Sequence, residues 1–72
     1  MLRSEIAKQL KEELIKEHED GSTIGISRVR GKMEVYFDYQ AINIHEFNEL
    51  LDIAVESTYD LIEKGAKPYV FI

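Results

Sequence analysis

The fold is decided by residues 23–39, TIGISRVRGKMEVYFDY. Apolar and polar residues alternate over 32–39, with Met33, Val35, Phe37 and Tyr39 on one side. Alternation with a period of two is typical of a half-buried β-strand. Gly31 separates this run from the apolar residues of 23–30. We therefore predict a β-hairpin of two strands, 23–30 and 32–39, with a two-residue loop at Gly31.

The segments on either side of this hairpin have the pattern of amphipathic helices. Over 1–19, apolar residues recur every four positions, which predicts a helix that stops at Gly21. A second helix is expected from Asn43 to about Lys64. Asn43 and Glu46 have the spacing of a capping box, and Gly65 follows as a stop signal.

The sequence ends in an apolar, β-branched run, residues 68–72, which predicts a short third strand. The expected order is αββαβ. We expect one α+β domain, residues 1–72, in which two helices pack on one face of a small sheet made of the hairpin and the C-terminal strand.

Composition narrows the class of protein. The chain has 72 residues, a net charge of −5 and no cysteine. Disulfides, thiolate metal sites and cysteine nucleophiles are thereby excluded. No apolar run is long enough to cross a membrane, so we expect a soluble, cytoplasmic protein with no membrane partner.

The small size of the chain favours self-association. A domain this short buries a modest share of its surface, and oligomerisation is one remedy when disulfides are absent. The apolar side of the helix expected at 43–64 is broader than one three-stranded sheet can cover. We expect Leu50, Ile53 and Val55 to meet a second copy, giving a homodimer. The alternative is that the first helix covers them within a monomer.

Acidic residues form a stripe along the same helix. Their spacing of three and four places them on one face: Glu49, Asp52, Glu56, Asp60 and Glu63. This stripe is either a solvated face, a partner of arginines in the same chain, or a surface that docks on a basic partner protein. No basic patch is visible, so direct binding to nucleic acid is not expected.

Residues with catalytic or metal-binding chemistry are few. His45, Glu49 and Asp52 could share one helix face, but a zinc site needs more nitrogen or sulfur ligands, so we expect no metal and no other cofactor. No serine has a neighbouring base, and no glycine-rich phosphate loop is present, so we expect no enzyme. Tyr36 is expected on the exposed hairpin face, as an interface aromatic or an ordinary strand tyrosine.

The sequence thus predicts a small acidic, non-enzymatic protein-interaction module that self-associates through its second helix. The alternative is an acidic inhibitor or nucleic-acid mimic, whose carboxylate stripe occupies a basic cleft on another protein.

Overall fold

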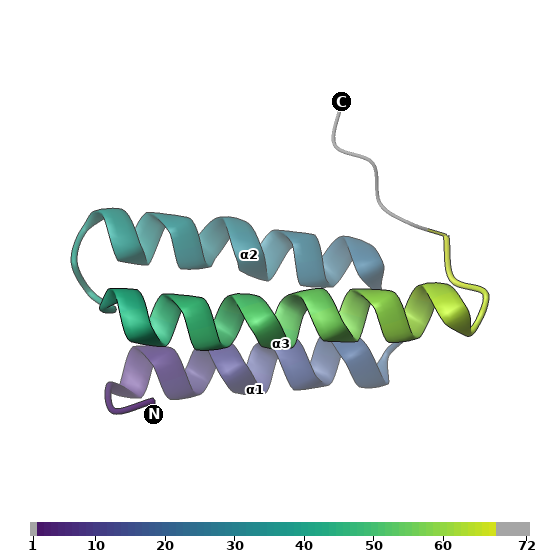
Figure 1. Ribbon diagram of the computed structural model, residues 1–72, viewed down its shortest axis with the longest axis horizontal. Coiled ribbons are helices and arrows are strands. Elements are labelled where there is room, and N and C mark those ends of the chain that lie inside the picture. Colours follow the sequence, from purple (N-terminus) through teal and green to yellow (C-terminus); the bar gives the residue numbers. More distant parts are fainter. Residues whose placement is uncertain (1, 68–72) are drawn as a thin grey trace.

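The computed structural model describes residues 2–67, which form three α-helices and no strand. α1 spans Glu5–Glu19, α2 spans Thr23–Asp38 and α3 spans Ile44–Glu63. α1 and α3 run in the same direction, α2 runs opposite to both, and each helix contacts the other two (Figure 1). The predicted α+β class and αββαβ order are therefore wrong, and the chain folds as a three-helix bundle.

The predicted hairpin is one continuous helix, α2. Its buried apolar residues Ile26, Val29 and Met33 are spaced three and four apart, so they line one side of a helix. Of the four residues expected on one strand face, Met33 is buried, whereas Val35 and Tyr39 are exposed. Gly31 lies in the middle of the helix and is exposed, so it forms no turn.

The start of α2 carries a signal that the strand prediction overlooked. Ser22 is the N-cap, and its hydroxyl accepts a hydrogen bond from the backbone N–H of Gly25. The preceding stop at Gly21 is confirmed, because this residue adopts a positive φ of 71° after α1. α2 ends in a similar way, but there Gln40 takes the left-handed position, with φ of 61°.

The predicted boundaries of α3 are confirmed. The Asn43 side chain accepts from the Glu46 N–H, and the Glu46 carboxylate accepts from the Asn43 N–H, which completes the capping box. Gly65, with φ of 98°, follows the end of the helix. The expected third strand, residues 68–72, lies outside the described residues.

The core fills the space between the three helices. Its members come from all three helices and from the segment before α3, so packing rather than local sequence joins them. The buried apolar residues are Ala7, Leu10, Leu14, Ile26, Val29, Met33, Ile42, Leu50, Ala54 and Leu61. Tyr36, expected on an exposed sheet face, instead packs partly buried against this core.

Candidate functional site

Glu46 joins the starts of the two parallel helices. Its side chain is only 3% exposed. One carboxylate oxygen accepts hydrogen bonds from the backbone N–H of Arg3, the N–H of Ser4 and the Ser4 hydroxyl, at 3.0–3.1 Å. The other oxygen completes the capping box of α3. Glu46 therefore fixes the position of α1 relative to α3.

These hydrogen bonds also determine the charge state of Glu46. The backbone N–H groups of Ser4 and Asn43 donate to the carboxylate and lower the pKa of Glu46 to about 2. Two helix N-termini meet at this point, and their dipoles favour a negative charge there as well. The buried carboxylate is thus ionised at neutral pH and serves as a structural link.

A second polar link ties α1 to the far end of α3. His18 Nε2 lies 2.6 Å from an Asp60 carboxylate oxygen, and Lys64 Nζ lies 3.0 Å from the same oxygen. The hydrogen bonds from His18 and Lys64 lower the pKa of Asp60. Part of the predicted acidic stripe is therefore used to hold helices of this chain together.

The predicted acidic stripe accordingly divides into two groups. Glu49 and Asp60 are partly buried on the side of α3 that faces α1. The other three carboxylates are exposed: Asp52, Glu56 and Glu63. Within residues 2–67 no ion pair joins any of these three carboxylates to an arginine.

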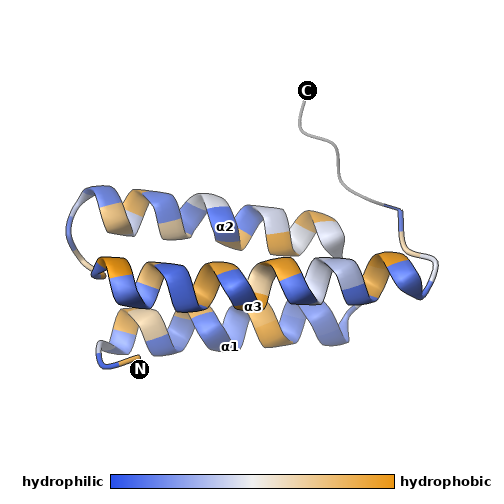
Figure 2. Ribbon diagram, in the orientation of Figure 1, coloured by the Kyte–Doolittle hydropathy of each residue, from blue (hydrophilic) through white to orange (hydrophobic). Residues whose placement is uncertain are grey.

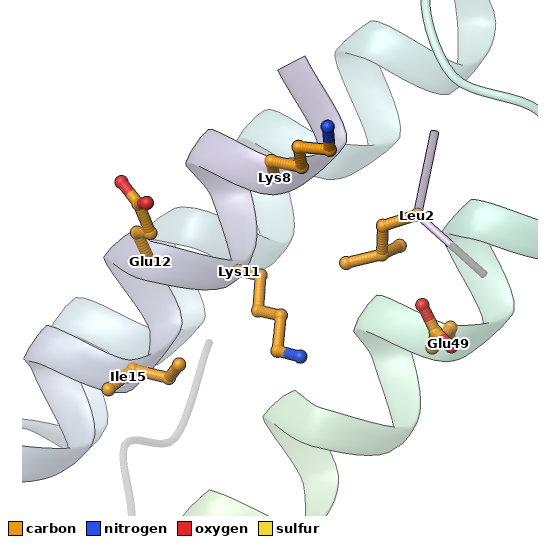
Figure 3. A pocket seen from close by; sticks show the side chains of 6 residues that line it. All are labelled: Leu2, Lys8, Lys11, Glu12, Ile15 and Glu49. Carbon is orange, nitrogen blue, oxygen red and sulfur yellow. The ribbon is translucent and has the colours of Figure 1, made fainter. Parts of the chain in front are cut away.

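An open hollow lies between α1 and α3. In Figure 3, Lys11 extends from α1 into the gap, facing Leu2 and Glu49 on the opposite side. Both charge signs and the apolar side chains of Leu2 and Ile15 line it. This mixed and shallow lining lacks the convergent polar groups that orient a small-molecule ligand.

The residues considered for metal binding do not form a metal site. Within residues 2–67 no group of three or more His, Asp or Glu side chains is placed to hold a metal ion. His45 and Asp52 are exposed, whereas Glu49 is turned toward the hollow beside α1.

The three residues predicted for self-association lie on different sides of α3. Leu50 is fully buried in the core of its own chain, with 0% exposure. Ile53 is partly buried and shares its side of the helix with Glu46, Glu49 and Asp60, which face α1. Val55 alone lies on an outer face, with 36% of its surface exposed.

Val55 belongs to an outer strip of α3 that we call the α3 seam. The seam runs along the edge of α3 that faces α2, where Figure 2 shows a row of apolar segments. Ile44 is 47% exposed within it. Its six residues are spaced alternately four and three apart: Ile44, Asn48, Leu51, Val55, Thr58 and Ile62.

α2 borders the seam on one side. Phe37 of α2 stacks on Phe47 of α3, with ring centroids 4.9 Å apart. Thr23, at the other end of α2, donates to the Lys67 carbonyl beyond α3. Ser27, Arg30 and Glu34 lie between Thr23 and Phe37 at helical spacing, so they share the face of α2 that adjoins α3.

The far border of the seam is acidic. Asp52 follows Asn48 by four residues, so it lies beside the seam on the side away from α2. Within residues 2–67 neither Arg30 nor Asp52 takes part in an ion pair. The α2 border of the seam therefore carries one cation and one carboxylate, Arg30 and Glu34, and the far border carries Asp52.

The sequence contains a signal for the seam that we did not use. Ile44, Leu51 and Thr58 are spaced by seven, and Asn48, Val55 and Ile62 form a second set with the same spacing. Two such sets, offset by three and four, are the pattern of a coiled-coil contact.

Comparisons with known proteins assign no family. No protein-family model matches the chain, and no match was found among curated proteins or among solved structures. In the described part of the chain, no helix combines the length and apolar character that crossing a membrane requires.

Proposed function

We propose that this chain is a non-enzymatic protein-interaction module that self-associates through the α3 seam. The observation that supports the proposal is the regular spacing of the seam, in which large apolar side chains are left exposed. Ile44 and Val55 remain 47% and 36% exposed after the core is complete. Large apolar side chains gathered in one strip are typical of contact surfaces.

A second copy is the partner that fits the seam best. The heptad spacing of the seam is the pattern by which one helix packs against another of the same kind. The same strip on both subunits is what a two-fold dimer requires. Of the three residues that the sequence predicted for self-association, Val55 lies in the seam, whereas Leu50 and Ile53 do not. The other large apolar residues of the proposed contact are Ile44, Leu51 and Ile62.

We expect a reversible dimer. From Ile44 to Ile62 the seam is about 27 Å long, at 1.5 Å per residue, which is less than three heptads. Such a contact is short, so the fraction of dimer should rise with protein concentration.

The alternative function, an acidic inhibitor or nucleic-acid mimic, has less support. Asp60 is engaged by His18 and Lys64, and Glu49 is partly buried beside α1, so three of the five carboxylates of the predicted stripe remain exposed. If the mimic is correct, binding to a basic protein should fall steeply with salt and should not need the seam.

The test is the solution mass by sedimentation equilibrium from micromolar to millimolar concentration. The wild-type mass should rise from 8.4 kDa toward twice that value. Val55→Lys should remain a monomer because it places a charge in the seam. The control is Val35→Lys on α2, where Val35 is 52% exposed and outside the seam, and it should behave as wild type.

Two results would overturn the proposal. One is a wild-type mass of a single chain throughout the concentration range. The other is a Val55→Lys variant that dimerises as well as wild type while its circular dichroism shows the same helical fold.

A further inference from the structure

We infer that the α3 seam and the face of α2 beside it form a binding groove for an extended apolar segment, and that residues 68–72 of the same chain are its occupant. Bound there, the segment competes with a second copy for Val55 and Ile62. The competition rests on the proposed self-association, whereas the binding within one chain does not.

The first argument is the place where the described chain ends. After α3, Ala66 packs against the core, and the Lys67 carbonyl accepts a 2.8 Å hydrogen bond from the Thr23 hydroxyl. Thr23 is the buried first residue of α2, and Ile62 lies at the corresponding end of the seam. In Figure 1 this stretch, in yellow, passes from the end of α3 to the level of α2. The chain that follows Lys67 therefore begins at one end of the groove.

The second argument is the chemistry of the two walls. The α3 wall consists of seam residues and is mainly apolar: Leu51, Val55, Thr58 and Ile62. The α2 wall is polar, and Ser27, Arg30 and Glu34 line an open hollow there. Within residues 2–67 these three side chains take part in no hydrogen bond and no ion pair.

The free polar groups on the α2 wall suit an extended backbone. An extended segment leaves its own N–H and C=O groups without partners, so it binds where other groups can pair with them. Arg30 can donate to such carbonyls, Glu34 can accept from such N–H groups, and the Ser27 hydroxyl can do either. The apolar α3 wall then takes up the side chains.

Residues 68–72 have the composition and the length that this groove requires. Their sequence is Pro-Tyr-Val-Phe-Ile, so either face of an extended segment presents apolar side chains. At about 3.3 Å per residue the segment spans roughly 16 Å. The distance along α2 from Thr23 to Glu34 is also about 16 Å, at 1.5 Å per residue.

The attachment at Lys67 favours the segment of the same chain over that of a second copy. A site reached through a short connection experiences an effective concentration on the order of millimolar. At micromolar protein concentration the same-chain segment therefore has the advantage. Because it covers Val55 and Ile62, its binding lowers the affinity of the seam for a second copy.

Paired cysteines test the binding within one chain, which has no cysteine of its own. Ile72→Cys is combined with Glu34→Cys, at the far end of the groove. The matched control combines Ile72→Cys with Val35→Cys, since Val35 is the next residue of α2 and is 52% exposed outside the seam. After mild oxidation at low micromolar concentration, mass spectrometry measures the disulfide formed within one chain. We expect the Glu34 pair to form it at least about tenfold faster than the Val35 pair.

Two results would overturn the binding within one chain. One is an equal rate of disulfide formation for the two pairs. The other is a disulfide of the Glu34 pair that joins two chains and does not form within one, because the segment would then bind a second copy.

The double variant Val70→Ser, Phe71→Ser tests the competition. It removes two apolar side chains from the segment and frees the seam. The dissociation constant of the dimer, measured by sedimentation equilibrium, should therefore fall by about threefold or more. Ile24→Ser is the control, because Ile24 is 50% exposed and outside the seam, and it should behave as wild type. An unchanged or higher dissociation constant for the double variant would overturn the competition.

The two experiments separate this inference from the proposed function. If wild type and the double variant both remain monomeric up to millimolar concentration, self-association is wrong and the competition fails with it. A fast same-chain disulfide of the Glu34 pair would still support the binding of residues 68–72 in the groove.

Discussion

Glu46 carries a structural role that its exposed neighbours do not share. Its carboxylate is buried and accepts hydrogen bonds from the beginnings of both α1 and α3. Loss of the negative charge would leave several N–H donors with a weaker acceptor, in a place with little access to water. The packing of α1 beside α3 therefore depends on one side chain.

We expect Glu46→Gln to lower the free energy of unfolding by on the order of 2 kcal/mol at neutral pH. The measurement is urea unfolding followed by circular dichroism. Glu56→Gln is the matched control, because Glu56 is exposed on the same helix, and its effect should be within about 0.5 kcal/mol. Equal effects for the two variants would contradict the role assigned to Glu46.

The same residue predicts a pH dependence with a definite sign. The pKa of Glu46 is lowered from 4.5 to about 2 in the folded chain. The carboxylate therefore stabilises the fold fully above pH 4.5, and this contribution is lost as the pH falls toward 2. The difference in stability between wild type and Glu46→Gln should shrink over that interval.

Among the elements, α2 is where the sequence and the structure disagree. Its apolar residues fit a helix at Ile26, Val29 and Met33, but they also fit a strand between Met33 and Tyr39. β-branched residues and two glycines lower its helix propensity, so local preference does not decide between the two. The contacts of α2 with α1 and α3 decide it, and these are not visible from local sequence.

Gly31→Ala tests the helical assignment of α2. A Cβ at this position would meet no atom within 4 Å. In a helix the substitution should raise the free energy of unfolding by about 0.5–1 kcal/mol, because alanine loses less conformational freedom than glycine on folding. Destabilisation would instead indicate the turn of a hairpin. The measurement is thermal unfolding at low protein concentration.

Gly25→Ala in the same helix provides the contrast. A Cβ at Gly25 would overlap the Glu17 side chain of α1, so that side chain must move aside. We therefore expect less stabilisation than for Gly31→Ala. Equal gains at both positions would contradict a cost for moving the Glu17 side chain aside.

The elements differ in how much the sequence reveals of them. α3 was predictable because its signals agree: a capping box at Asn43, an apolar side and a glycine stop. The candidate surface was predictable only in part. Val55 was found, but Leu50 was assigned outward, since the sequence does not show that α1 packs along the core side of α3.

At the scale of the whole molecule, the net charge and the apolar seam have opposite effects on self-association. The net charge of −5 opposes association of two copies, whereas the α3 seam favours it. Salt reduces the repulsion between copies. The apolar contact of the seam should therefore carry the association over a wide range of ionic strength.

The most direct test of the account is methyl NMR of the wild-type chain during dilution, because it locates the contact as well as detecting it. Self-association through the seam predicts concentration-dependent shifts at the methyl groups of Ile44, Leu51, Val55 and Ile62. Ile24 and Val35 are also exposed, but they lie outside the seam and should not shift. Shifts confined to Ile24 and Val35, or no shifts at any concentration, would contradict self-association through the α3 seam.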